Sequence, residues 1–198
     1  MRAKCLPLVL FPSINWFAQA IENGSVNIFG EEFYDKRLHP NRFSIVSANG
    51  KMELSVPLLG GRNQKGKLSD LLFSGEEWKR KHLQALQSAY GKSPYFEFYS
   101  DEVEKLIRVE DGNFQSLAIE SIKFLSQNFI PEMKIEITED ECEIISLKNF
   151  SPFKYHQPFE QRFGFISNLS ALDLLFNCGP DSRSVLKRML ASPKKIVE

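Results

Sequence analysis

The dipeptide Asn49-Gly50, set between two segments with strand-like apolar alternation, constrains the fold of this chain more than any other feature. Both residues tolerate the positive φ angles of a tight turn, so the pair predicts a β-hairpin with strands at residues 43–47 and 52–56. Three apolar side chains should share one face of the second strand: Met52, Leu54 and Val56. We therefore expect one face of the hairpin to be buried.

The rest of the chain changes between helical and strand-like hydrophobic periods, which predicts the mixed α/β fold class. We expect a single compact domain over residues 1–198, with a central mixed sheet, the hairpin and several packed helices. Residues 4–11 have the character of a buried strand. Together with a helix capped by Ser13 and a strand at residues 25–29, they predict a βαβ-like opening. Later helices are predicted to start at Ser74 (with Glu77 as a capping box), Asn113, Ser170 and Asp181, and later strands to lie at residues 133–137 and 142–147.

Charge and cysteine content narrow the classes of function. The 25 basic and 25 acidic side chains cancel, so no overall field favours nucleic acid or anionic lipid, and no nucleic-acid partner is expected. Cys5, Cys142 and Cys178 lack the spacing of a zinc site, so we expect no metal and a reducing compartment. Pro7 and Pro12 break the apolar N-terminal stretch. It therefore predicts neither a signal peptide nor an integral membrane segment, and the expected location is cytoplasmic.

No motif predicts a cofactor or a known nucleophile, because the chain contains no G-x-G-x-x-G, H-E-x-x-H or G-x-S-x-G. Residues 61–67 match only the G-x-x-x-x-G-K part of a P-loop, since Leu68 stands where the magnesium-binding hydroxyl residue belongs. The residues after Lys67 have the character of a strand instead of the required helix. A mobile basic loop is the alternative interpretation.

Two polar segments are candidates for a binding site, and the first is residues 35–42. Three cations and a histidine precede the hairpin there. Asn41 and Arg42 are its candidate substrate-binding residues, because a planar guanidinium holds a phosphate or carboxylate through two hydrogen bonds. The alternative is that these side chains are simply solvated.

The second segment, residues 155–163, is the densest polar and aromatic cluster of the chain, and its proline predicts a loop. A pocket for a polar ring such as a sugar could be lined by Gln157, Glu160 and Arg162, with His156 as a candidate catalytic residue. The alternative is a local ion pair between Glu160 and Arg162.

His82 is the other candidate catalytic residue. It lies four residues after Trp78 on the apolar face of a predicted helix. It is therefore either a hydrogen-bonded core histidine or a general acid or base whose imidazole titrates near neutrality. Lys79 and Lys81 are expected to point into solvent.

Several separated blocks of the chain, taken in order, resemble the WbqC-like family. They are Phe11-Pro12, Glu32-Phe33-Tyr34, Asn41-Arg42, Ala48-Asn49-Gly50, residues 78–82, Ser93-Pro94-Tyr95-Phe96 and residues 160–177. The resemblance implies a place among accessory proteins of polysaccharide and O-antigen gene clusters, with a suggested role in acyl or aminoacyl transfer to amino sugars. It transfers a context and no catalytic residue.

Two hypotheses about function follow. The first is a transferase, or an accessory protein of one, that binds a nucleotide-linked or otherwise activated sugar in surface-polysaccharide synthesis. Asn41 and Arg42 would hold an anionic group, and His82 or His156 would move a proton. The rival is a non-catalytic binding or scaffold protein of a glycan-synthesis complex. An exposed aromatic patch at residues 95–99 would favour the scaffold, and a deep polar pocket with a histidine would favour the enzyme.

Overall fold

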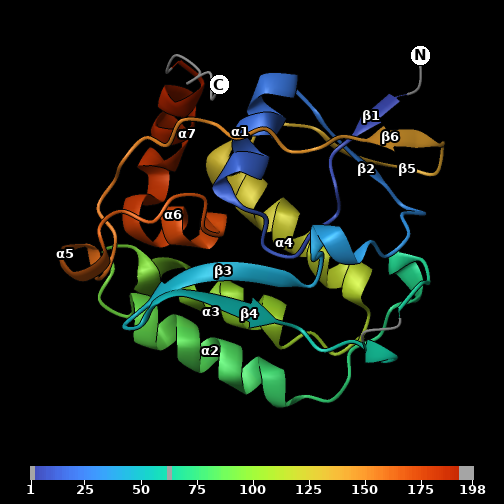
Figure 1. Ribbon diagram of the computed structural model, residues 1–198, viewed down its shortest axis with the longest axis horizontal. Helices are drawn as coiled ribbons and strands as arrows, with labels where there is room; N and C mark the ends of the chain where they lie inside the picture. The colour runs from blue at the N-terminus through green and yellow to red at the C-terminus, as the bar shows by residue number, and fades with distance from the viewer. Residues whose placement is uncertain (1–2, 62–63, 192–198) are drawn as a thin grey trace.

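The computed structural model describes residues 3–61 and 64–191 of the chain. The mixed α/β class is confirmed (Figure 1). The α-helices are α1 (Ile14–Asn23), α2 (Glu77–Tyr90), α3 (Phe96–Ile107), α4 (Phe114–Phe129), α5 (Glu160–Phe163), α6 (Ala171–Cys178) and α7 (Ser182–Ala191). The strands are β1 (Ala3–Cys5), β2 (Val26–Phe29), β3 (Arg42–Ser47), β4 (Gly50–Ser55), β5 (Ile135–Thr138) and β6 (Cys142–Ile144). Short 3-10 turns are η1 (Lys36–Leu38), η3 (Leu68–Asp70) and η4 (Gly179–Asp181).

The predicted hairpin is confirmed as β3 and β4. The strands are antiparallel, with pairs running from Arg42 opposite Ser55 to Ser47 opposite Gly50. The two residues between the paired strands are Ala48 and Asn49, so the turn lies one residue earlier than predicted. Gly50 begins β4 with a φ of 95°, which a glycine adopts at no steric cost, whereas Asn49 does not have the predicted positive φ. The buried face is shorter than predicted: Leu54 in β4 and Val56 just after it are buried, but Met52 is exposed.

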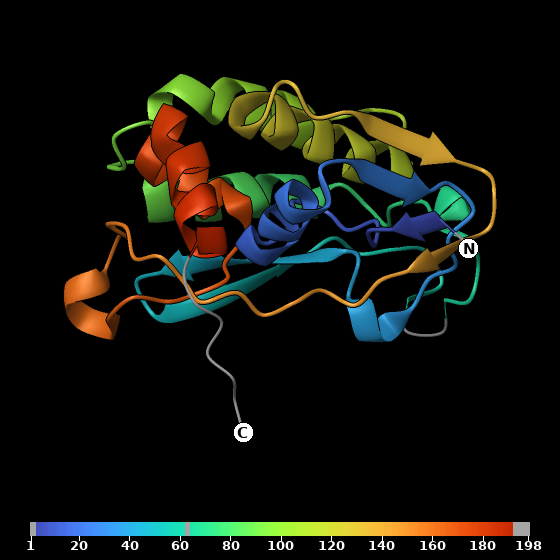
Figure 2. The same cartoon turned by 90° about the horizontal axis from the view of Figure 1, so that it is seen from above.

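The predicted central mixed sheet is replaced, among the described residues, by three two-stranded sheets. β1 pairs in parallel with β6, and β2 pairs in parallel with β5. The backbone amide of Leu6 donates to the carbonyl of Asn27 (2.9 Å), so the two parallel pairs lie side by side (Figure 2). The βαβ-like opening therefore does not form, since β1 and β2 each take their parallel partner from a strand more than 100 residues later.

The predicted strand at residues 4–11 is wrong beyond Cys5. The backbone amides of alternate residues there bond to unrelated partners. Leu8 donates to the carboxylate of Glu32 (3.0 Å), and Leu10 donates to the carbonyl of Pro40 (2.8 Å). A strand requires one neighbouring strand as the common partner, so this segment is extended and buried but belongs to no sheet.

A disulfide bond joins Cys5 in β1 to Cys142 in β6. Their separation of 137 residues gave no indication of this pairing, because only the non-local contact of β1 with β6 brings the two thiols together. Cys178 is a free thiol. The expectation of a reducing compartment had implied that all three cysteines are unpaired, but two of them form a disulfide.

Two of the predicted helix caps are confirmed. The side chain of Asn113 accepts a hydrogen bond from the backbone amide of Ser116 at the start of α4. Ser170 accepts one from the amide of Leu172 at the start of α6. Each cap satisfies an amide that the first turn of a helix leaves without a partner.

The capping box predicted at Ser74 is wrong. Helix α2 begins at Glu77, and Glu76 occupies the N-cap position without a side-chain cap hydrogen bond. The reason is local: Ser74 donates its amide to the carbonyl of Pro57 (2.8 Å), and Gly75 has a positive φ of 74°. The chain therefore turns between Ser74 and the helix.

An aromatic-rich core joins the elements, as the phenylalanine content predicts. Rings meet edge to face at centroid distances near 5 Å, which is a favourable geometry. The phenylalanine pairs are Phe11 with Phe43 (5.0 Å), Phe17 with Phe129 (5.1 Å) and Phe96 with Phe176 (5.0 Å). These contacts connect α1, α3, α4, α6 and the hairpin, so the N- and C-terminal parts share one core.

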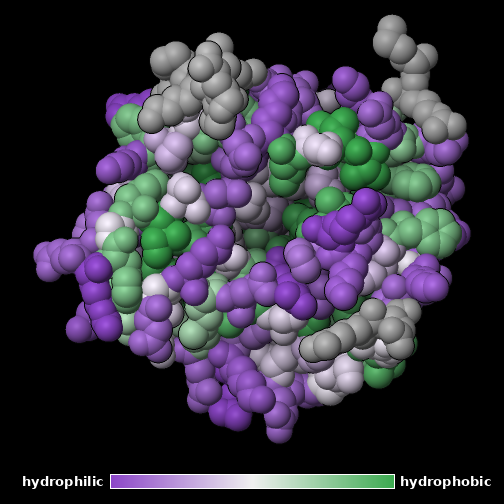
Figure 3. Space-filling view, in the orientation of Figure 1, coloured by the Kyte–Doolittle hydropathy of each residue, from purple (hydrophilic) through white to green (hydrophobic). Residues whose placement is uncertain are grey.

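The surface is mostly hydrophilic on the face shown in Figure 3, with a smaller hydrophobic group near β1, β2 and β6 at upper right. The exposed aromatic patch at residues 95–99 that would have favoured the scaffold hypothesis is absent, because Phe96 and Tyr99 are buried and only Phe98 is largely exposed (76%). Within the described ranges, none of the helices has both the length and the apolar character needed to cross a membrane.

Candidate functional site

Asn41 and Arg42, predicted to bind substrate, lie at the base of the hairpin. The Asn41 side chain donates to the carbonyl of Val56 (2.7 Å) and accepts a long hydrogen bond from the hydroxyl of Tyr34 (3.4 Å). Arg42 pairs with Glu53 on the opposite strand (2.8 Å), and both side chains are exposed. Both predicted residues therefore have partners within the hairpin and its entry loop.

The second predicted group lies at the tip of the hairpin, where Arg162 donates to the carbonyl of Ala48 (2.7 Å). Glu160 does not pair with Arg162 and instead faces His156 (Oε2 to Nδ1, 3.6 Å). His156 is 81% exposed in its side chain and lines an open hollow of about 610 Å³ with Lys92. The six residues of β3 separate this group from the base of the hairpin, so the structure does not unite the two groups in one site.

Gln157 belongs to a buried network around Asp173. The Asp173 carboxylate accepts hydrogen bonds from the hydroxyl of Tyr90 (2.9 Å), the amide of Gln157 (2.8 Å) and the hydroxyl of Tyr155. Burial raises the pKa of Asp173, although these three donors act in the opposite direction. Val46 donates its backbone amide to Tyr90 (3.2 Å), which ties the network to the hairpin. An enclosed carboxylate that is satisfied by protein groups fixes the core and is not open to a ligand.

His82 is enclosed between the rings of Phe43 and Trp78, at centroid distances of 5.6 and 5.2 Å. Burial lowers the pKa of His82 to about 4, so the ring is neutral at neutral pH. It lies outside the hollow beside His156, and its surroundings are those of a core histidine. Lys79 was expected to point into solvent, but its side chain is buried. Its ammonium donates a hydrogen bond to the carbonyl of Val109 (2.5 Å).

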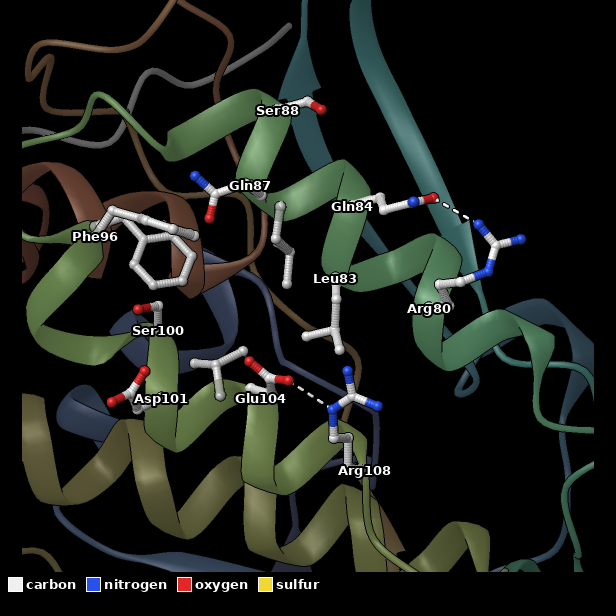
Figure 4. Close-up of a pocket in the computed structure, with 13 residues that line it drawn as sticks. Arg80, Leu83, Gln84, Gln87, Ser88, Phe96, Ser100, Asp101, Glu104 and Arg108 are labelled. Carbon is white, nitrogen blue, oxygen red and sulfur yellow. Dashed lines mark hydrogen bonds and ion pairs between the residues drawn. The ribbon is translucent and has the colours of Figure 1, made fainter.

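A groove of about 700 Å³ runs between α2 and α3 (Figure 4). Arg80 and Arg108 lie on its rim, but each is engaged on its own helix. Arg80 donates to Gln84 (3.1 Å), and Arg108 pairs with Glu104 (2.6 Å). Asp101 adds a further acidic side chain (Figure 4), so positive and negative charges balance along the groove.

A third hollow, of about 640 Å³, opens where the chain leaves β2, and we call it the Glu32 hollow. Its walls come from the segment after β2, the loop before η3 and the start of β6, at the end of the molecule opposite α5 (Figures 1 and 2). Its lining residues are Phe29, Glu32, Phe33, Tyr34, Asp35, Lys36, Leu38, Gln64, Lys65, Glu141, Cys142 and Ile144.

Glu32 is the buried acid of this hollow, with only 5% of its surface exposed. Burial raises the pKa of Glu32 to about 7, against the opposite effect of the hydrogen bond from the Leu8 amide, and the nearby charge of Asp35 raises it further. At neutral pH the group is therefore divided between acid and carboxylate. This is the state that suits a general acid or base.

Two cation-bearing loops that the sequence singled out meet at this hollow. Lys36 comes from the segment before the hairpin, and Lys65 comes from the P-loop-like segment, of which the structure describes all but two residues. The likeness to a P-loop goes no further. Lys67 pairs with Glu31, and the turn η3 (Leu68–Asp70) follows in place of the predicted strand.

Sequence reasoning assigned no role to Glu32, because a single glutamate in a polar segment is usually solvated. Its burial depends on distant residues: Leu8 binds its carboxylate, and the amide of Leu68 donates to its backbone carbonyl (2.8 Å). The available signal was its position beside two aromatic residues in the Glu32-Phe33-Tyr34 block. In the part of the chain that the structure describes, no three His, Cys, Asp or Glu side chains gather as potential metal ligands.

A model of the WbqC-like protein family matches residues 9–149. The chain belongs to the WbqC-like protein family. Neither a curated protein nor a solved structure gives a significant match to it. The WbqC-like match includes every residue that lines the Glu32 hollow, and it ends before residues 160–177, a block that the resemblance had included. His156 and Arg162 also lie beyond the matched residues.

Proposed function

We propose that this WbqC-like protein binds a nucleotide-linked or otherwise activated sugar in the Glu32 hollow and acts as, or assists, a transferase in surface-polysaccharide synthesis. The observation that carries the proposal is a buried carboxyl group with a pKa near neutrality, placed at a hollow that two lysine-bearing loops also line. A titratable group in such a position is a common sign of acid–base chemistry. The substrate class is the one that the family resemblance implies.

The residues of the Glu32 hollow have separate roles in phosphate binding, sugar contact and proton transfer. Lys36 and Lys65 contact phosphate oxygens of the sugar nucleotide as point charges. Phe33 is 61% exposed and offers its ring to the apolar face of the sugar. In acyl transfer, an amino group of the sugar forms a bond to the acyl carbon while the bond from that carbon to the leaving group breaks. Glu32 takes the proton that the nitrogen loses.

Binding is tested by isothermal titration calorimetry with UDP-N-acetylglucosamine, free UDP and pyrophosphate. The Lys36→Ala/Lys65→Ala double variant should bind the sugar nucleotide at least tenfold more weakly, since each lysine supplies a charged hydrogen bond of roughly 1.5–3 kcal/mol. Lys51→Ala is the matched control, because Lys51 is an exposed lysine of β4 that lies outside the hollow. Glu32→Gln should keep most of the affinity and lose glycan modification in cells.

The groove between α2 and α3 provides the rival location. If Arg80→Ala/Arg108→Ala abolishes binding and the lysine double variant does not, the assignment to the Glu32 hollow is wrong. If no sugar nucleotide binds the wild type, the result supports the rival hypothesis of a non-catalytic binding or scaffold protein. That hypothesis receives no support from residues 95–99, because Phe96 and Tyr99 are packed in the core.

A further inference from the structure

A smaller and more enclosed cavity, of about 170 Å³, lies between the start of α1 and the segment that runs from β6 toward α6 (Figure 1). We call it the Asn15 cavity. Its lining residues are Ile14, Asn15, Asn149, Phe150, Pro152, Phe153, Tyr155, Phe165, Ser167, Asn168 and Met189. None of them lines the Glu32 hollow.

Asn15 forms a polar part of the cavity wall and is only 5% exposed. Its backbone amide donates to Oδ1 of Asn168 (3.0 Å). Its own carboxamide has no hydrogen-bond partner within residues 3–61 and 64–191. The nitrogen and oxygen of this carboxamide are not among the fully buried polar atoms that lack a partner, so they are accessible from the cavity. A ligand that occupies the cavity can therefore bond to the carboxamide.

The chemistry of the lining limits the ligand. The described residues that line the cavity include no Asp, Glu, Lys, Arg or His, so a phosphate or carboxylate would find no opposite charge there. Three asparagines and Ser167 each provide groups that both donate and accept hydrogen bonds. Four aromatic side chains add apolar faces to the lining: Phe150, Phe153, Tyr155 and Phe165.

The walls of the cavity are held in place before any ligand binds. Tyr155 is fixed by the hydrogen bond of its hydroxyl to Asp173 and by an edge-to-face contact with Phe165 at 5.3 Å. Asn168 has a left-handed φ of 53°, and its side chain is held by the amide of Asn15. Sites whose side chains are already ordered lose less entropy on binding.

We propose that the Asn15 cavity binds one neutral polyhydroxylated ring, of the size of a single monosaccharide. Adjacent hydroxyl groups of a sugar both donate and accept, which matches the carboxamides, and the C–H faces of the ring match the aromatic side chains. A volume of 170 Å³ holds roughly five or six waters at about 30 Å³ each, which suits one ring and excludes a nucleotide. The inference does not depend on the function proposed for the Glu32 hollow.

The test is a titration of the full chain with the methyl glycosides of glucose, galactose and N-acetylglucosamine, followed by ligand-observed NMR and calorimetry. At least one glycoside should bind saturably. Asn15→Leu should weaken that binding at least tenfold, and Ser167→Ala at the exposed rim should weaken it several-fold. Gln127→Leu, an exposed carboxamide of α4 outside the cavity, is the matched control and should bind like the wild type.

Thermal unfolding of the same variants separates a ligand-binding role of Asn15 from a structural one. Asn15→Leu removes an unpaired amide and should leave the melting temperature unchanged or raised, whereas a structural asparagine would lower it. If Asn15→Leu does not fold, the exposed Ser167→Ala and Asn149→Ala variants decide the question by their affinities. The proposal is overturned if no glycoside binds saturably, if these substitutions leave binding intact, or if adenine or uracil binds in preference to the sugars.

Discussion

Replacing Glu32 with glutamine should stabilise the protein at neutral and alkaline pH and have a smaller effect in acid. The pKa of this carboxyl rises from its ordinary 4.5 to about 7 in the folded chain. Between these values the folded protein holds a proton that the unfolded chain has lost. Stability therefore falls as the pH rises from about 4.5 through 7. Glutamine removes this titration and keeps an oxygen that can accept the hydrogen bond of the Leu8 amide.

The size of the effect follows from the two pKa values. One pH unit corresponds to about 1.4 kcal/mol, so ionisation of Glu32 lowers the stability of the wild type by about 1 kcal/mol at pH 5, about 2 kcal/mol at pH 6 and about 3 kcal/mol from pH 7 upward. For a chain of this length, about 3 kcal/mol corresponds to a difference of roughly 6–12 °C in melting temperature.

Urea unfolding of the wild type and Glu32→Gln, followed by tryptophan fluorescence from pH 5 to pH 9, measures this difference. Glu31→Gln is the matched control, because the neighbouring Glu31 lies at the surface and forms a pair with Lys67. A stability difference that stays constant within about 0.5 kcal/mol from pH 5 to pH 9 would refute the reasoning. It would mean that Glu32 titrates as an ordinary carboxyl, and the acid–base proposal would lose its basis.

Three further predictions test other parts of the structure. His82→Phe should remove part of the loss of folding stability in acid. Since the pKa of His82 falls from 6.5 to about 4 on folding, the wild type should lose about 2 kcal/mol of unfolding free energy by pH 5. Unfolding of both proteins at pH 5 and 7.5 measures the change. Asn113→Ala should cost about 1 kcal/mol through loss of a helix cap, whereas Ser74→Ala should cost less than half as much in the same assay, and equal costs would restore the rejected capping box. Reducing the Cys5–Cys142 disulfide, which joins residues 137 apart in sequence, should lower the free energy of unfolding by up to about 5 kcal/mol. Thiol titration of the unfolded, unreduced protein should find one thiol. Three thiols would contradict the pairing.

The features that could be predicted from the sequence are those whose causes lie within a few residues. The hairpin predicted from Asn49-Gly50 and the cap at Asn113 depend on local backbone conformation and hydrogen bonds, and both are present, although the turn itself lies at Ala48 and Asn49. The pattern Ser74 with Glu77 has the same local appearance but fails, because the positive φ of Gly75 redirects the chain. The parallel pairs β1–β6 and β2–β5 could not be predicted, since each joins segments more than 100 residues apart.

In the candidate site, too, the local features could be predicted from the sequence and the contacts between distant segments could not. The segment that carries Lys36 was recognised as a possible binding segment, because clustered cations are visible in the sequence. The segment that carries Lys65 matched a P-loop only in part, with a mobile basic loop as the alternative. Their meeting at one hollow was not visible, and neither was the burial of Glu32 against Leu8. His82 was selected for its position four residues after Trp78, and His156 for its place in the polar cluster of residues 155–163. The structure encloses His82 in the core and leaves His156 exposed.

The two cavities differ in their relation to the family, and this bears on what each contributes. The Glu32 hollow is built wholly from residues within the matched range 9–149. The Asn15 cavity combines Asn15 from that range with Ser167 and Asn168 from beyond it. A family model describes what its members have in common, so the acid–base chemistry proposed for the Glu32 hollow rests entirely on residues that the family model covers. The C-terminal residues complete the Asn15 cavity. Under the proposal made for that cavity, substitutions there should change which neutral ring binds without altering the titration of Glu32.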